Sequence, residues 1–224
     1  MKRFEMEEAV SLLGGILDAL LETLEGRVDR SMMEARNNIG KLRADATELL
    51  EAGAMAGPLL KCFDLCLAAG SSRVAMDGVR RAMVARSPKY VPGVIVATTG
   101  IFFSLLEQAR ILGDITFKSR EEIDVMLSTM HAEFEPAEEF AATHTADPRV
   151  YEALVGLHAA LSSDLSDRAL PLPRLVRYHF PTRMPSVKLA MRIYGDARRA
   201  DELVRVNRVV HPAFCLADGK CLSA

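Results

Sequence analysis

The chain contains no tryptophan, and aromatic residues make up only 6% of its 224 residues. A sugar-stacking enzyme cleft and an aromatic platform for single-stranded nucleic acid are therefore disfavoured. The charges nearly cancel, with 28 basic and 30 acidic side chains, which argues against a uniformly basic nucleic-acid-binding protein. Half of the residues are hydrophobic, so the chain can bury a core. Abundant Ala, Leu and Met indicate a mostly helical protein.

Sequence motifs for catalysis are also missing. The chain has no phosphate-binding loop, no dinucleotide-binding glycine fingerprint, no His-Glu-x-x-His and no Gly-x-Ser-x-Gly elbow. Its histidines do not cluster in the sequence, and its carboxylate pairs fall on amphipathic stretches where solvation explains them. We therefore predict that the protein is not an enzyme, with no catalytic residue and no cofactor.

The four cysteines are interpreted as free thiols. Residues 1–10 do not form a secretory leader, so a reducing compartment is expected. Cys62 and Cys66 lie one helical turn apart among apolar neighbours, which is typical of buried thiols. His211, Cys215 and Cys221 are the nominal metal ligands, but no Cys-x-x-Cys and no fourth ligand at a standard spacing accompanies them. No metal site is predicted.

The longest uncharged stretch covers residues 91–106. It is shorter than the roughly 20 residues that a membrane span needs, and it contains proline, glycine and threonine. We expect a buried core helix over residues 91–112 and no membrane span.

Apolar residues from Val10 to Leu49 recur mostly at three- and four-residue spacing, which predicts one long N-terminal helix. Gly14, Gly15, Gly26 and Gly40 weaken this helix and mark where it can break. Its apolar stripe must pack against another helix or another subunit.

Further helices are expected up to the Pro171-Leu-Pro173 break. Ser119 and Glu122 form a capping-box pattern, and Asp147-Pro148 is a second helix start. The expected ranges are 59–69, from 71 or 72 to 86, 91–112, 119–144 and a helix that begins at 147. Residues 1–170 are therefore predicted to form a helical domain, a bundle that begins with the long helix.

From residue 171 the pattern changes to a small α+β module over 171–224. A strand is expected near residues 175–180, then helices over 187–194 and 198–206, and a final strand before residue 222. Gly195 ends the first of these helices, and Asn207 is expected to take the left-handed exit from the second. Asp218-Gly219 is expected to turn the chain into the last strand.

Charge is distributed unevenly along the chain. Residues 118–173 carry 4 basic and 11 acidic side chains, whereas residues 174–224 carry 10 basic and 4 acidic ones. This pattern fits two surfaces with different partners, or two surfaces that attract each other, and it also fits ordinary solvated helix faces.

The carboxy-terminal run is the most specific feature of the sequence. It reads Leu189-Ala-Met-Arg-Ile-Tyr-Gly-Asp196, then Arg199-Ala-Asp-Glu-Leu203, then Asn207-Arg-Val-Val-His-Pro-Ala-Phe214. This run resembles the end of the DNA circularisation proteins of Mu-like phages, which are tail and baseplate-hub components. The resemblance extends back through residues 167–173 and Tyr178, and more loosely to about residue 60. In that family a separate amino-terminal domain normally comes first, and this sequence starts without a segment that resembles it.

The same run is similar to a LysM module. That resemblance implies a small α+β fold that binds peptidoglycan in many proteins and acts as a protein adaptor in phage tails. The candidate binding or interface residues are Tyr194, Arg198, Arg199, Asn207, His211 and Phe214.

The resemblance implies a non-enzymatic structural component of a Mu-like contractile phage tail, at the baseplate hub or tail tube. Such a protein is made in the bacterial host cytoplasm, assembles with other tail and baseplate proteins in the virion, and forms a homo-oligomer, a trimer or a hexamer. One alternative is a peptidoglycan-binding LysM-type module on a helical stalk. Another is DNA binding or DNA circularisation, in which five arginines would contact phosphates: Arg192, Arg198, Arg199, Arg205 and Arg208.

Overall fold

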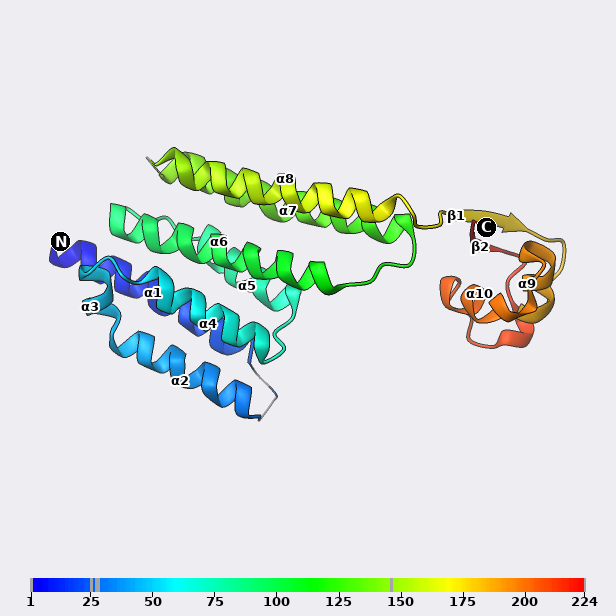
Figure 1. Cartoon of the computed structure of the whole chain (residues 1–224), viewed down its shortest axis with the longest axis horizontal. Helices are drawn as coiled ribbons and strands as arrows, with labels where there is room; N and C mark the ends of the chain where they lie inside the picture. Colours follow the sequence, from blue (N-terminus) through cyan, green and yellow to red (C-terminus); the bar gives the residue numbers. More distant parts are fainter. Residues whose placement is uncertain (1, 25, 27–28, 146, 224) are drawn as a thin grey trace. The chain divides into compact units, whose positions relative to one another are not determined.

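The computed structural model describes residues 2–24, 26, 29–145 and 147–223. It is mainly helical, with 73% helix, and a two-stranded antiparallel sheet lies near the C-terminus (Figure 1). The chain forms two compact units, one from Met1–Ile115 and Thr129–Ser162 and the other from Thr116–Ser128 and Ser163–Ala224. The mainly helical composition and the two strands near the C-terminus are as predicted.

The first unit begins with six helices. They are α1 (Arg3–Glu22), α2 (Arg30–Ala44), α3 (Ala46–Glu51), α4 (Ala56–Ala68), α5 (Arg73–Val84) and α6 (Val91–Asp114). The last three lie close to the ranges that the sequence predicts. Ser72 caps α5, because its hydroxyl oxygen accepts a hydrogen bond of 3.2 Å from the Ala75 amide.

The prediction of one long N-terminal helix is wrong, because α1, α2 and α3 divide that stretch. Gly26 has a φ of 81°, a left-handed conformation that cannot continue an α-helix and that glycine adopts without strain. Asp29 then starts α2, since its carboxylate accepts a hydrogen bond of 2.8 Å from the Met32 amide. Each of the three helices buries apolar residues of the stripe. The helical spacing of apolar residues therefore continues along the sequence although the chain breaks between the helices.

Helix α6 packs against α1, α4 and α5. It is the one helix in the described part of the chain that is long and apolar enough to cross a membrane, judged by length and composition alone. Core helices of soluble proteins meet the same criterion, and 61% of its apolar window is buried inside the protein. The prediction of a buried core helix over these residues is confirmed.

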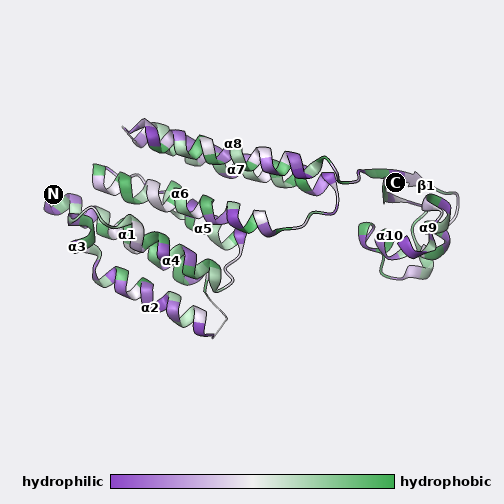
Figure 2. Ribbon diagram, viewed as in Figure 1, coloured by the Kyte–Doolittle hydropathy of each residue, from purple (hydrophilic) through white to green (hydrophobic). Residues whose placement is uncertain are grey.

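Two long helices follow, α7 (Arg120–His144) and α8 (Pro148–Ala169). Hydrophilic and hydrophobic residues alternate along α8, as expected of an amphipathic helix (Figure 2). The capping box at the start of α7 forms in part. The Glu122 amide donates to the Ser119 hydroxyl oxygen at 3.4 Å, but the Glu122 carboxylate accepts from the Lys118 amide at 2.8 Å. Asp147 caps α8 by accepting from the Arg149 amide at 3.0 Å.

The second unit contains the strand–helix–helix–strand order that the sequence predicts. Its elements are β1 (Leu175–His179), α9 (Ser186–Tyr194), the 3-10 turn η1 (Ala197–Arg199), α10 (Ala200–Val206), the 3-10 turn η2 (Pro212–Phe214) and β2 (Asp218–Leu222). The strands pair antiparallel, with Leu175 opposite Leu222 and His179 opposite Asp218. Gly195 ends α9 with a φ of 72°, as expected.

Two local predictions in this unit are wrong. Arg208, with a φ of 49°, takes the left-handed exit from α10, whereas Asn207 has a φ of −96°. Asp218 and Gly219 begin β2 and do not turn the chain into it. The Asn207 side chain instead forms hydrogen bonds with Leu203 on α10 and Lys220 on β2.

Candidate functional site

Asn207 fastens the end of α10 to β2. Its side-chain nitrogen donates to the carbonyl oxygens of Leu203 and Lys220, at 2.9 and 2.7 Å. Its side-chain oxygen accepts from the Lys220 amide at 2.7 Å. All three bonds are internal, so this candidate interface residue holds the unit together.

Tyr194 and Arg199 belong to the same internal network. The Tyr194 hydroxyl oxygen accepts from the Leu222 amide at 3.1 Å, and the Arg199 guanidinium carbon lies 3.7 Å from the centre of the Tyr194 ring. Arg199 is also paired with Glu202 at 2.8 Å. Burial, and the hydrogen bond from the Tyr194 hydroxyl to Glu202, raise the pKa of Tyr194. The network joins the end of α9 to α10 and β2.

The other three candidate residues are exposed to solvent. Arg198 is paired with the neighbouring Asp196 at 3.0 Å. The His211 ring accepts from the Ala213 amide through Nδ1 at 3.3 Å, and its centre lies 5.5 Å from that of Phe214. Phe214 is 66% exposed, an unusual position for an aromatic side chain in a small folded unit.

Helix α9 presents an exposed apolar face formed by residues outside the candidate set. Val187 and Met191, one helical turn apart, are 55% and 56% exposed, while Leu189 and Ala190 fill the core on the opposite side. Helix α9 lies beside η2, which carries Phe214, and the exposed Leu216 follows η2. We call these four exposed side chains the α9–η2 surface: Val187, Met191, Phe214 and Leu216. In the sequence, the sign of this exposed face is that apolar residues fall on both sides of the short helix, so one side cannot face the core.

Basic side chains accompany the α9–η2 surface. Lys188 and Arg192 are exposed on α9, each next in sequence to one of its apolar residues. Among the described residues from 174 to 223, eight exposed basic residues have no ion pair with a described residue: Arg174, Arg177, Arg183, Lys188, Arg192, Arg205, Arg208 and Lys220. The positive charge of residues 174–224 is therefore only partly neutralised from within.

All four cysteines are free and buried, as predicted for Cys62 and Cys66. Burial raises the pKa of Cys62 to about 11 and that of Cys66 to about 12, so both remain thiols at neutral pH. The Cys221 thiol lies 3.4 Å from the carbonyl oxygen of Val176, to which it donates. Within the described ranges, no three His, Cys, Asp or Glu side chains are grouped so that they could hold a metal ion.

The fold brings together two histidines that are distant in sequence. Nδ1 of His131 on α7 lies 2.7 Å from Nε2 of His158 on α8, whose Nδ1 lies 2.8 Å from Glu138. The His158 ring also stacks on Phe134, with 4.6 Å between ring centres. These contacts join α7 to α8, and sequence spacing gave no sign of them.

No protein-family model matches the chain, and no curated protein sequence matches it.

Proposed function

We propose that this chain is a non-enzymatic structural component of a Mu-like contractile phage tail or a related particle, at the baseplate hub or tail tube. It acts by protein–protein assembly, as a homo-oligomer and with other tail and baseplate proteins. In this proposal residues 1–170 are a helical bundle, and residues 171–224 are a LysM-like module that docks on a neighbouring protein.

The observation that carries the proposal is the strand–helix–helix–strand arrangement of the second unit. The run that resembles the phage family falls on α9, α10 and η2. Its residues form hydrogen bonds that attach these helices to β2. Asn207 fastens α10 to β2, and Tyr194 reaches the amide of Leu222. The resemblance therefore coincides with a folded module that has its own core.

The chemistry of the α9–η2 surface favours a protein partner. Exposed Val187, Met191 and Phe214 offer apolar contact area, as in the centre of a protein interface. A DNA backbone would engage the basic side chains and leave these apolar groups in water. A glycan would need aromatic and polar groups together, and Phe214 with His211 is a small set for that purpose. The expected partner is an apolar protein surface with acidic residues at its edge.

A second copy of the chain offers acidic residues of this kind. Residues 118–173 carry 11 acidic side chains against 4 basic ones. Glu135 and Glu139 are both exposed on α7, one helical turn apart, which is also the spacing of Lys188 and Arg192 on α9. Contacts between the acidic and basic segments of successive copies would be heterologous, and such contacts form a ring when the rotation between copies closes.

The test is the native mass, measured by light scattering at two protein concentrations, alone and with candidate tail-tube and hub proteins. We expect a trimer, a hexamer or a defined co-complex. The double variant Val187→Asp/Met191→Asp should lose this assembly, whereas Val74→Asp, at a valine on α5 that is 62% exposed, should keep it. A monomer that ignores these partners would contradict the proposal. Retention on peptidoglycan, or salt-sensitive DNA binding, by that monomer would favour the corresponding alternative.

A further inference from the structure

The two-stranded sheet of the second unit leaves each of its strands with an outer edge. In an antiparallel pair, successive residues direct their backbone N–H and C=O groups alternately toward the partner strand and away from it. Just beyond β1, the Phe180 amide donates to the Ala217 carbonyl oxygen at 2.8 Å, so the even-numbered residues of β1 face β2. Leu175, Arg177 and His179 therefore direct their backbone groups to the outer edge of β1.

Side chains close the outer edge of β2. Asn207 bonds to both backbone groups of Lys220, and the Tyr194 hydroxyl oxygen accepts from the amide of the last β2 residue. The outer edge of β1 is closed at its first residue, where the Glu121 carboxylate accepts from the Leu175 amide at 2.8 Å. The two edges of one small sheet are thus treated differently along the rest of their length.

The remainder of the β1 edge is open. Arg177 and His179 are exposed, and no described residue forms a hydrogen bond with the backbone groups that they direct outward. A row of unpaired N–H and C=O groups on an edge strand is a template for pairing with another strand. Extended peptides bind in this way, by adding a strand to an exposed sheet edge.

The side chains along this edge define the chemistry of the added strand. Arg177 lies directly opposite Lys220 on the sheet, and neither has an ion pair with a described residue. Like charges opposite each other on neighbouring strands are destabilising, so an acidic side chain beside Arg177 would offset this repulsion. On the other face, Val176 is 49% exposed next to the buried Cys221, and an apolar side chain would cover it.

We propose that the open edge of β1 binds an extended segment of another protein, in which acidic and apolar residues alternate, as an added strand. A second copy of this chain is disfavoured, because two-fold pairing centred on this edge would place Arg177 beside its own counterpart. The acidic residues 118–173 fall mostly on α7 and α8, so they are not extended. The β1 edge lies outside the α9–η2 surface, so this site does not depend on the proposed assembly function.

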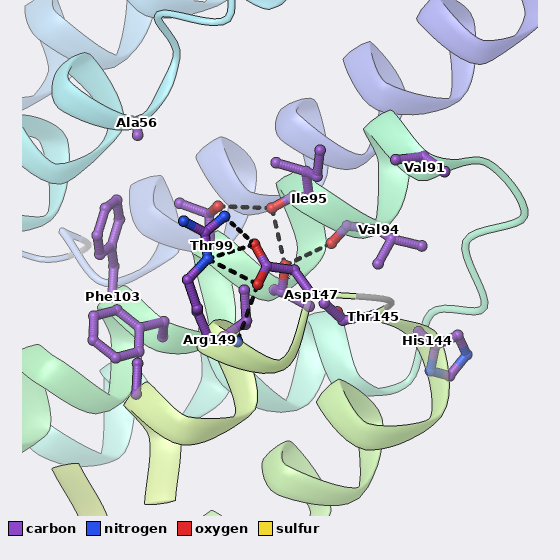
Figure 3. Close-up of a pocket in the computed structure, with 14 residues that line it drawn as sticks. Ala56, Val91, Val94, Ile95, Thr99, Phe103, His144, Thr145, Asp147 and Arg149 are labelled. Carbon is purple, nitrogen blue, oxygen red and sulfur yellow. Dashed lines mark hydrogen bonds and ion pairs between the residues drawn. The ribbon is translucent and has the colours of Figure 1, made fainter. Parts of the chain in front are cut away.

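The apolar groove along α6, in the first unit, defines no occupant in this way. Asp147 and Arg149 lie beside it and pair with each other at 2.6 Å, so their charges cancel (Figure 3). The β1 edge, in contrast, defines both the backbone conformation and the charge of the segment that fits it.

The probe for this site is a fluorescein-labelled peptide of alternating Glu and Val, about eight residues long, added to the full chain. Fluorescence anisotropy should show saturable binding with one peptide per chain. A peptide with proline in place of valine has the same charge but cannot pair as a strand, and it should bind at least tenfold more weakly. Absence of binding, or equal binding of the two peptides, would overturn the proposal.

Amide hydrogen exchange locates the bound peptide. The amides of Arg177 and His179 should exchange at least tenfold more slowly when the peptide is bound, because they then donate to the added strand. The amide of Val176 faces β2 and should change less than twofold. Peptide binding that leaves exchange at Arg177 and His179 unaltered would contradict strand addition.

Variants test the charge, in about 0.15 M salt so that distant charges are screened. Arg177→Glu should weaken binding of the Glu–Val peptide at least tenfold and create binding of a Lys–Val peptide, a gain that a misfolded protein would not show. Arg205→Glu, the same change at an exposed arginine on α10, should leave binding of the Glu–Val peptide within twofold. The double variant Val187→Asp/Met191→Asp should also keep it, which separates this site from the assembly surface. Equal effects of the Arg177 and Arg205 changes would overturn the proposal.

Discussion

Arg73 on α5 donates from Nη1 to both carboxylate oxygens of Glu133 on α7, at 2.6 and 2.8 Å, in the interior of the first unit. The same nitrogen donates to the side-chain oxygen of Gln108 on α6 at 3.2 Å. Three helices are thus joined at one guanidinium group. Burial raises the pKa of Glu133, and the hydrogen bond and charge of Arg73 oppose that rise. The pair fixes how α5 and α7 meet.

We expect Glu133→Met to lower the free energy of unfolding by about 3 kcal/mol, because it leaves the Arg73 charge buried without its partner. The double change Arg73→Met/Glu133→Met should recover most of that loss, since both buried charges are then gone. Glu7→Gln breaks an exposed ion pair with Arg3 of similar length, 2.7 Å, and should cost less than about 0.5 kcal/mol. Urea unfolding of the four proteins measures these differences. A double variant as unstable as Glu133→Met would contradict the account.

Gly100 allows α6 to approach α1 closely. A Cβ atom at this position would lie 2.5 Å from Cδ1 and 3.1 Å from Cγ1 of Ile16, whose side chain is wholly buried, so its packing in the core would have to shift. Gly100→Ala should therefore cost about 1–3 kcal/mol through overpacking. Gly78→Ala on α5 is the control, because no atom lies within 4 Å of its added Cβ, and it should stabilise the protein slightly. Thermal unfolding of both variants tests the prediction, and equal melting temperatures would refute it.

Asn207 should be required for the attachment of β2. Asn207→Ala removes the hydrogen bonds to Leu203 and to both backbone groups of Lys220, and should lower the stability of the second unit by about 1–3 kcal/mol. The direct measurement is amide hydrogen exchange at Lys220, which should become much faster. Arg198→Ala removes only an exposed pair with Asp196 and should leave that exchange unchanged.

Features set by neighbouring residues could be predicted from the sequence, and those set by distant contacts could not. The caps at Ser72 and Asp147 depend on residues two or three positions away, so a local pattern is enough. The break at Gly26 could not be distinguished from a tolerated glycine, because the apolar stripe continues beyond it. The role of Asn207 depends on Lys220, and the meeting of His131 and His158 depends on how α7 packs on α8.

The candidate interface was predicted only in part, for the same reason. Tyr194, Arg199 and Asn207 attract notice in the sequence because they are polar or aromatic, yet their groups are used inside the unit. Phe214 remains exposed, together with Val187 and Met191, which the sequence shows only as ordinary apolar residues of a short helix. Which side of such a helix faces the core follows from tertiary packing.

The buried thiol of Cys66 should make the first unit sensitive to alkaline pH. Burial raises its pKa from 9.0 to about 12, so above pH 9 the unfolded chain releases a proton that the folded protein retains. The contribution of the protonated Cys66 thiol to the free energy of unfolding is present in full below pH 9. It is lost as the pH rises toward 12, because unfolding then becomes coupled to proton release. Between pH 8 and pH 10.5 the free energy of unfolding of the first unit should fall by about 1–2 kcal/mol. Urea unfolding at both pH values should show a smaller loss for Cys66→Ala than for the unchanged protein, and Cys215→Ala, in the other unit, should leave the loss in the first unit unaltered.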